Sequence, residues 1–334
     1  MYFPNYELEE NRCLGQILRL QAEHNGDTTF LLEGERRLSY AEANSLVNRY
    51  LHGLSELGVG PSDRILIFMH GCTEFILLAL AAHKLGAVWV PVNTDYRGQW
   101  LADTITDSRA RLLITETDLL PRMEELKGQI DCDEQLLKTD LLQFEALSDA
   151  EPDMSHIHYG DTCAILWTSG TTGKSKGVMQ SHNVWVRACI HNHDNYETKP
   201  GDIIYNCLPM YNSAAWVACI YHALIAGIGC AVDPIFSVSD FWDRIRYYGA
   251  TQTMTLGAMH MFLWNQPPRA DDAENPLRMA NMVPMPEALL EPFCQRFGLE
   301  GNLQGFGQSE VMLLLSRKET PQKRWKANAL GGLS

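Results

Sequence analysis

The stretch from Thr168 to Gly177 reads TSGTTGKSKG and combines hydroxyl groups, glycines and two cations with almost no bulk. Glycine reaches positive φ and lets the backbone approach a ligand closely, and exposed N–H groups in such turns form concavities that bind anions. Hydroxyl and ammonium groups add further donors. The stretch therefore predicts a polyphosphate-binding loop. Its ligand-facing residues are Thr168, Ser169, Gly170, Thr171, Thr172, Gly173, Lys174 and Lys176.

Two other interpretations of this loop fit less well. A Walker A loop would need its first glycine at position 168, where this chain has threonine, and a helix that opens at its lysine. Gly177 would interrupt such a helix. A flexible linker has a similar composition, but apolar runs at 165–167 and 178–181 flank the loop. They predict a hairpin of two strands, followed by a helix that starts near His182.

A second motif, GFGQSE at residues 305–310, places glycines, an aromatic ring, a hydroxyl and a carboxylate in a fixed order. Alone it would be read as a turn with an exposed glutamate. Its position downstream of the lysine loop gives it meaning, because a hard divalent cation binds carboxylate oxygens together with substrate phosphates.

The two motifs together closely resemble the signature of the adenylate-forming superfamily, which comprises acyl-CoA synthetases, adenylation domains of peptide synthetases and luciferases. The resemblance implies that Glu310 holds Mg²⁺, that Ser309 bonds a phosphate oxygen and that Phe306 packs beside the adenine and acyl groups. It also implies that Gly305 and Gly307 contact the nucleotide, and that Thr168, Lys176 and Glu310 serve catalysis. Phe306 and Ser309 stand where tyrosine and threonine are more usual.

The resemblance extends along most of the chain. Residues 38–57 look like an early helix with Ser39 as N-cap, and a strand at 65–69, a helix at 73–85 and a strand at 88–93 form βα units. Such units predict parallel sheets. We therefore expect an α/β fold: two βαβ-type subdomains, about 1–160 and 161–300 and interleaved, with mostly parallel sheets flanked by helices, as in the N-terminal domain of this superfamily.

Residues 205–212, YNCLPMYN, resemble the family segment that leads to the acyl pocket. Family members often carry histidine where this chain has Asn212, and asparagine does not titrate near neutral pH. The implied acyl site is lined by Tyr211, Asn212, Trp216, Gly257 and Ala258. Core packing is the alternative for the apolar positions. Residues 282–286 stand where the family has a Gly-Ala-Pro turn under the adenine: Pro284 fits, whereas Met282 replaces the glycine and is expected to crowd the nucleotide.

Composition narrows the function classes. The chain has 334 residues, 46% of them hydrophobic, so it can bury a large core. Its net charge of -14 argues against sequence-independent nucleic-acid binding. The N-terminus lacks a signal-peptide pattern and no apolar run reaches membrane-spanning length, so a cytoplasmic location is the default. Nine cysteines without a CxxC pair suggest neither zinc nor disulfides, and we expect His182 to be structural.

By the resemblance, a small carboxylic acid attacks the α-phosphate of Mg-ATP, which gives an acyl-adenylate and pyrophosphate. Coenzyme A then takes the acyl group. The implied cofactors are ATP, Mg²⁺ and coenzyme A; the partners are the acid and coenzyme A, without nucleic acid or a membrane span, and a homodimer is left open. The protein's own contribution is to position and neutralise charge.

The end of the chain limits this expectation. Residues 301–334 resemble the start of a distorted β-barrel subdomain, and the ribose-binding aspartate, the hinge and the C-terminal lid with its adenylation lysine lie beyond the resemblance. We expect a truncated N-terminal domain that binds nucleotide with impaired catalysis. Two alternatives remain: an adenylation domain that loads a carrier protein, and a catalytically silent binding protein.

Substrate choice is readable only by a finer resemblance. Residues 241–244, 249–251, 265–268, 271–272 and 276–278 look most like the crotonobetaine/carnitine-CoA ligase branch, which uses small quaternary-ammonium acids. Tyr211, Trp216 and Tyr221 would offer aromatic faces to such a cation, an interaction worth roughly 0.5–2 kcal/mol. Core packing is an equal alternative for these aromatic residues.

Overall fold

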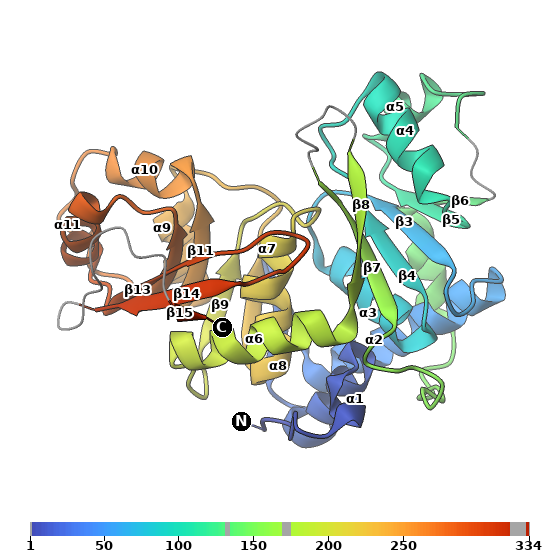
Figure 1. Ribbon diagram of the computed structural model, residues 1–334, viewed down its shortest axis with the longest axis horizontal. Coiled ribbons are helices and arrows are strands. Elements are labelled where there is room, and N and C mark those ends of the chain that lie inside the picture. Colours follow the sequence, from blue (N-terminus) through green and yellow to red (C-terminus); the bar gives the residue numbers. More distant parts are fainter. Residues whose placement is uncertain (1, 131–133, 169–174, 321–331, 334) are drawn as a thin grey trace.

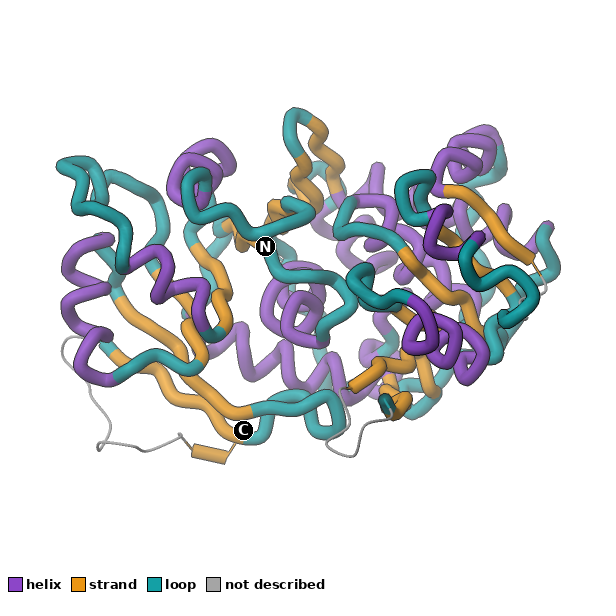
Figure 2. The backbone as a smooth tube through the Cα atoms, turned by 90° about the horizontal axis from the view of Figure 1, so that it is seen from above, coloured by secondary structure: helices purple, strands orange, loops and turns teal. Residues whose placement is uncertain are grey.

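The computed structural model describes residues 2–130, 134–168, 175–320 and 332–333. The described strands form two sheets that lie in separate lobes (Figure 1). The nine-stranded sheet has the order β15-β14-β13-β12-β11-β9-β10-β1-β2, and the six-stranded sheet has the order β6-β5-β3-β4-β7-β8. Seen from above, helices lie between the two sets of strands (Figure 2).

The strands of the six-stranded sheet are β3 (Arg64–Phe68), β4 (Val88–Pro91), β5 (Leu112–Thr115), β6 (Glu134–Leu137), β7 (Thr162–Thr168) and β8 (Lys176–Ser181). Those of the nine-stranded sheet are β1 (Thr29–Glu33), β2 (Arg36–Ser39), β9 (Ile203–Asn206), β10 (Gly229–Val232), β11 (Gln252–Leu256), β12 (Met279–Val283), β13 (Gly301–Phe306), β14 (Leu315–Glu319) and β15 (Gly332–Leu333).

The α-helices are α1 (Leu14–Asn25), α2 (Tyr40–Glu56), α3 (Thr73–Leu85), α4 (Gly98–Ser108), α5 (Leu120–Glu124), α6 (His182–Tyr196), α7 (Ser213–Ala215), α8 (Tyr221–Ala226), α9 (Phe241–Tyr248), α10 (Ala258–Trp264) and α11 (Glu287–Phe297). Two 3-10 segments, η1 (Glu9–Arg12) and η2 (Lys138–Ala146), and a π-helical turn, η3 (Trp216–Ile220), complete the described helices.

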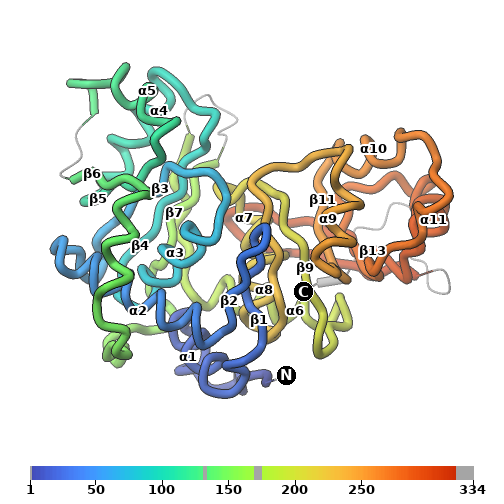
Figure 3. The backbone as a smooth tube through the Cα atoms, turned by 180° about the vertical axis from the view of Figure 1, so that it is seen from behind, coloured from blue at the N-terminus to red at the C-terminus, as the bar shows by residue number. Residues whose placement is uncertain are grey.

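The sheets confirm the expected fold class. Strands β3, β4, β5 and β6 pair in parallel, as do β1, β10, β9, β11, β12 and β13. Antiparallel pairs occur at the margins, as β1 with β2, β7 with β8, and β14 with both β13 and β15. Figure 3 shows the blue strands β1 and β2 beside strands from the later half of the chain. Each sheet therefore takes strands from both sides of residue 160.

Local sequence explains two of the helices that support the sheets. Ser39 caps α2 as expected: its side chain accepts from the N–H of Glu42, and the Glu42 carboxylate accepts from the N–H of Ser39. Helix α3 is apolar on all sides, and eleven of its thirteen residues are buried. A helix that is hydrophobic all round belongs in a core, and α3 packs against α1 and α2.

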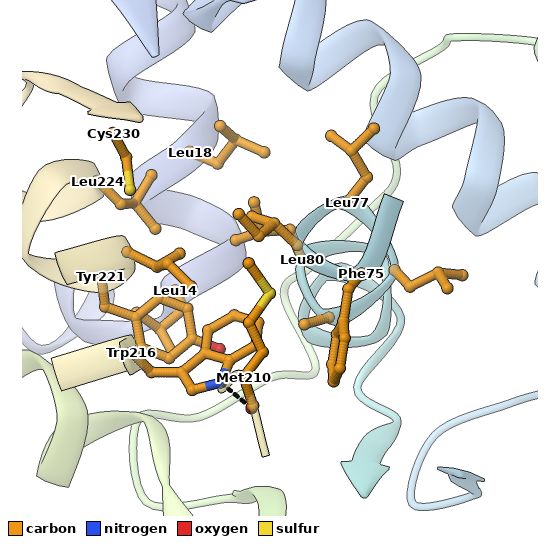
Figure 4. Packing of buried hydrophobic residues seen from close by; sticks show 14 of the residues in the cluster. Leu14, Leu18, Phe75, Leu77, Leu80, Met210, Trp216, Tyr221, Leu224 and Cys230 are labelled. Carbon is orange, nitrogen blue, oxygen red and sulfur yellow. Dashed lines mark hydrogen bonds between the residues drawn. The ribbon is translucent and has the colours of Figure 1, made fainter. Parts of the chain in front are cut away.

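The main core lies where α1, α3 and α8 meet (Figure 4). Trp216 is fully buried there, with its ring centre 4.3 Å from that of Trp89, and its Nε1 donates to the carbonyl of Met210 at 2.6 Å. Tyr221 is also fully buried, and its hydroxyl lies 2.5 Å from Nε2 of His83. This core fixes the segment that follows the predicted acyl motif.

Candidate functional site

The carboxyl ends of several parallel strands define the candidate site. Strands β9, β11, β12 and β13 are neighbours, and β11 and β12 are in register, with Leu256 opposite Val283. Parallel neighbours end at the same edge of a sheet, which is where ligands bind in open α/β folds. The predicted residues Gly257, Pro284 and Gly305 all follow or end these strands, so the fold brings them to one edge.

The turn after β11 explains why glycine stands at position 257. Gly257 has φ 52° and ψ -114°. Residues with a Cβ avoid this combination of backbone angles. Its N–H donates to the carbonyl of Val283 at 2.9 Å, which ties this turn to the end of β12. Ala258, the first residue of α10, is exposed beside it.

The turn after β12 corrects the expectation for Met282. The Met282 side chain is buried in the core cluster beneath α11, so it points away from the exposed edge. Its φ is not positive, and the position therefore does not demand glycine. Pro284 follows through a cis peptide bond with Val283 and is exposed. The substitution that was expected to crowd the nucleotide is thus absorbed by the core.

The acidic motif forms the connection between β13 and β14. A Cβ at Gly305 would lie 2.6 Å from the carbonyl oxygen of Leu315, and one at Gly307 only 1.8 Å from that of Met312. Close backbone packing therefore requires both glycines, whatever else they contact. Phe306 and Glu310 are exposed. The connection leaves the aromatic face and the carboxylate accessible.

The lysine loop joins β7 to β8, which pair as the predicted hairpin, with Thr168 opposite Lys176. Thr168 is half-buried, and its hydroxyl lies 3.4 Å from the carbonyl oxygen of Lys176, whose side chain is exposed. Six predicted ligand-facing residues, Ser169, Gly170, Thr171, Thr172, Gly173 and Lys174, lie outside the described residues. The two ends of the loop are therefore the part of it that the structure locates.

Gln180 joins the two motifs. It is buried on β8, and its Nε2 donates to the carbonyl oxygen of Ser309. The hairpin of the six-stranded sheet and the acidic connection of the nine-stranded sheet are thus in contact. Gln180 is not among the residues predicted from the sequence. Its signal was a polar side chain at an inward position of a strand whose neighbours Met179 and Ser181 point the other way.

A second missed residue, Gln304, lies two positions before Phe306. Its Oε1 accepts from the N–H of Met285 at 3.3 Å, and its Nε2 is buried without a partner among the described residues. A buried donor without an acceptor is costly. Its position directly before the GFG sequence was the available signal.

The predicted acyl residues separate into two groups. Tyr211 is half-buried and Asn212 is exposed. Burial raises the pKa of Tyr211, and the charges of Asp95 and Tyr96 act in the same direction. Trp216, by contrast, has no exposed surface. Neither Trp216 nor Tyr221 offers a face to a cation in this structure, and for both the core alternative fits.

Two histidines and one cysteine lie together in the core. His83, Cys163 and His182 are buried, with ligand atoms within 4.8 Å of one another. Nδ1 of His182 accepts the N–H of Leu14 at 3.3 Å, which caps α1. In neutral His182 the proton must then lie on Nε2, which leaves no free lone pair for a metal. Burial lowers the pKa of His182 to about 4, and we assign it a structural role.

A groove of about 870 Å³ is lined by residues other than the predicted site residues. It runs between the N-terminal segment, including Phe3 and Arg12, and the outer face of α6, including Arg187. Val311 of the acidic connection also lines it. None of the predicted site residues lines this groove, so it does not help to locate the nucleotide.

No described helix has the length and apolar character needed to cross a membrane.

Several curated proteins are similar to this chain. It is 30% identical over 303 residues to the medium/long-chain-fatty-acid–CoA ligase FadD6 of Mycobacterium tuberculosis, a match that covers 89% of this chain and 51% of that protein. It is 26% identical over 311 residues to a crotonobetaine/carnitine–CoA ligase of Escherichia coli, covering 89% of this chain and 60% of that one. The crotonobetaine/carnitine–CoA ligases, expected from the sequence as the most similar branch, are therefore one of several groups of proteins that the chain resembles. The chain spans about half the length of the relatives it matches.

Solved structures of similar proteins have the same fold as this chain. The inhibitor-bound N-terminal domain of FACL13 from Mycobacterium tuberculosis superposes with a TM-score of 0.83 at 26% identity, covering 89% of this chain and 76% of that one. The anthranilate CoA ligase AuaEII has a TM-score of 0.88 at 18% identity, covering 98% and 64%, and supports the fold alone. The profile of the AMP-binding enzyme family matches residues 18–332. The chain thus belongs to the AMP-binding enzyme family, and it corresponds to an N-terminal part of the longer relatives that it matches.

Proposed function

We propose that this chain is the nucleotide- and acid-binding part of an AMP-forming acid–thiol ligase. The observation that carries the proposal is the contact between Gln180 and Ser309, which joins the end of the lysine-loop hairpin to the acidic connection. Gln180 and Ser309 are 129 residues apart in sequence, and their contact supports one site formed by both motifs. Family membership and the similar CoA ligases support the reaction class.

The residues fall into roles by their chemistry. Lys174 and Lys176, with the hydroxyls of Thr168, Ser169, Thr171, Thr172 and Ser309, would bind the phosphates of ATP. Glu310 would hold Mg²⁺, because its exposed carboxylate supplies the oxygen ligand that this ion prefers. The ion neutralises phosphate charge when it is bound. The chain's own part is to hold donors near charge that develops in the reaction.

The base and the acid would lie along the strand ends of the nine-stranded sheet. Pro284, Gly305, Phe306 and Gly307 would contact the adenine, and the unpartnered Nε2 of Gln304 offers a buried donor nearby. Tyr211, Asn212, Gly257 and Ala258 would line the acyl site, with Trp216 packed behind them. Coenzyme A would be the acceptor. The identity of the acid, and a carrier protein as the alternative acceptor, stay open to test.

Calorimetric titration with Mg-ATP tests the site. Lys174→Ala, Lys176→Ala and Glu310→Ala should each weaken binding about tenfold or more, because each removes a charge-assisted contact worth roughly 1.5–3 kcal/mol. Lys127→Ala and Glu300→Ala remove the same charges at exposed positions elsewhere and should leave the affinity unchanged. Unaltered affinity in all three site variants would refute the assignment.

A further inference from the structure

His260 lies behind the strand ends and contacts two of the turns at once. It belongs to α10, three residues after Gly257, and it is fully buried. Its Nε2 lies 2.9 Å from the carbonyl oxygen of Pro284, and its Nδ1 lies 3.1 Å from the hydroxyl oxygen of Thr255. One imidazole thus connects the end of β11 with the cis-proline turn that follows β12.

The chemistry of these partners fixes the state of the ring. A carbonyl oxygen only accepts, so Nε2 must carry the hydrogen that it shares with Pro284. Burial lowers the pKa of His260, opposed by the bond to the Pro284 carbonyl, and the ring is therefore neutral near pH 7. Nδ1 then has a lone pair and accepts from the hydroxyl of Thr255. Both nitrogens are satisfied only in this tautomer.

The links continue on both sides of the ring. Gly257 donates its N–H to Val283, and Met285 donates its N–H to Oε1 of Gln304 on β13. Three adjacent strand ends are therefore connected through hydrogen bonds that do not belong to the sheet itself. His260 adds a side-chain connection between the first turn and the second, beside the backbone bond from Gly257 to Val283.

We propose that His260 is a positioning residue, which fixes the separation of the Gly257 turn and the cis-Pro284 turn through its Nε2–H bond. It touches neither the nucleotide nor the acid. This inference rests on the proposed function only in what the two turns bind, since the connection itself is independent of any ligand. Turns that are already ordered lose less freedom when a ligand binds, so the bond should favour binding at this edge.

Two substitutions separate the Nε2 bond from the rest of the side chain. In His260→Gln the amide nitrogen reaches the position of Nε2 and keeps the donor to Pro284. In His260→Asn the shorter side chain reaches only the position of Nδ1 and loses it. Asparagine is also the smaller of the two, so a third variant is needed to separate the bond from the volume: His260→Met has about the volume of glutamine but no donor, and it should behave like His260→Asn if the bond matters and like His260→Gln if only filled space matters.

Amide hydrogen exchange followed by NMR provides the test. In the Asn variant we expect the amides of Gly257 and Met285 to exchange about tenfold faster than in wild type, relative to the amides of α3, whereas the Gln variant should stay within about twofold. Equal rates in the two variants would overturn the proposal. Nitrogen shifts of His260 in the wild-type chain give a second test, because a proton on Nδ1 would overturn it without any variant.

Titration with Mg-ATP then separates this inference from the proposed function. Affinity should fall about tenfold in His260→Asn and be retained in His260→Gln. If the wild-type chain binds no nucleotide, the proposed function fails, and the exchange rates still decide whether His260 connects the turns. If nucleotide binds equally to wild type and the Asn variant, the positioning role is refuted.

Discussion

Charged residues near the strand ends of this molecule occur in two opposite states. At the six-stranded sheet the charges pair with one another: Glu116 accepts the N–H of His70 at 2.6 Å, and Lys138 lies 3.7 Å from Glu74 and 4.0 Å from Glu116. Arg36 also pairs with Glu74. At the candidate site, Glu310 follows β13 of the nine-stranded sheet, and Lys176 begins β8 at the margin of the six-stranded sheet opposite β6. Both side chains are exposed and have no side-chain partner within the described part of the chain.

This difference distinguishes structural charges from available ones. A half-buried charge that is already paired stabilises the fold, and a ligand would have to displace its partner. An exposed charge without a partner contributes little to stability and remains free for phosphate or a cation. Both edges are places where α/β folds bind ligands, so position alone does not identify the site. The pairing state of the side chains does.

The same substitution at the two edges should have opposite consequences. Glu74→Ala leaves Arg36 and Lys138 without their carboxylate, and we expect it to lower the free energy of unfolding by about 2 kcal/mol. Glu310→Ala should change that free energy by no more than about 0.5 kcal/mol. Urea denaturation followed by circular dichroism measures both. If Glu310→Ala destabilises the chain as much as Glu74→Ala, the distinction between structural and available charges is wrong.

Acid should weaken the paired edge through Glu74. Burial acts to raise the pKa of this carboxyl, but the bond from Arg36 and the charge of Lys138 outweigh it and hold the pKa below its ordinary value. The stabilisation is therefore present above the unfolded-state pKa of about 4.3 and is lost as the pH falls through the lower folded-state value. Unfolding free energies measured from pH 7 to pH 3 should fall less steeply in Glu74→Gln than in wild type. Parallel curves would show that another group controls the acid limb.

The parts of the fold that depend on local sequence could be predicted. The N-cap at Ser39, the helix at residues 73–85 and the hairpin around the lysine loop follow from neighbouring residues in the sequence, and the structure confirms them. The long-range pairing of β1 with β10 could not be predicted, because strand order depends on contacts between residues about 200 positions apart. The π-helical turn at Trp216–Ile220 also has no local signal in the sequence.

The site itself was predictable in its residue types but not in its supports. Glycine at 305 and 307 was read as ligand contact, whereas the structure also requires both for backbone packing against β14 and Met312. Trp216 was assigned to the acyl site from its position in the motif, and its burial depends on Trp89, which lies far away in sequence. Gln180, Gln304 and His260 act through tertiary contacts, which single-sequence patterns do not encode.

The contact between the two lobes should matter for binding more than for stability. Gln180→Leu keeps the volume of the side chain but removes the donor to Ser309, and we expect Mg-ATP affinity to fall about fivefold with roughly 1 kcal/mol of lost stability. Calorimetry and urea denaturation provide the two values. Met179→Leu, at the exposed neighbouring position, is the matched control. An affinity equal to that of the control would mean that the acidic connection is positioned without Gln180.

The smallest effect on Mg-ATP affinity is expected at Asn212. A substitution there should distinguish binding of the acid from binding of the nucleotide. Its side chain is exposed at the start of α7 and makes no hydrogen bond to a described residue. Asn212→His should therefore leave Mg-ATP affinity within about twofold and alter the ranking of acyl-adenylate analogues, because imidazole adds a titratable group beside Tyr211. Competition binding with short and betaine-type analogues measures that ranking. A large loss of Mg-ATP affinity would instead place Asn212 beside the phosphates. Residues 211–212 would then belong to the nucleotide site and not to the acyl site.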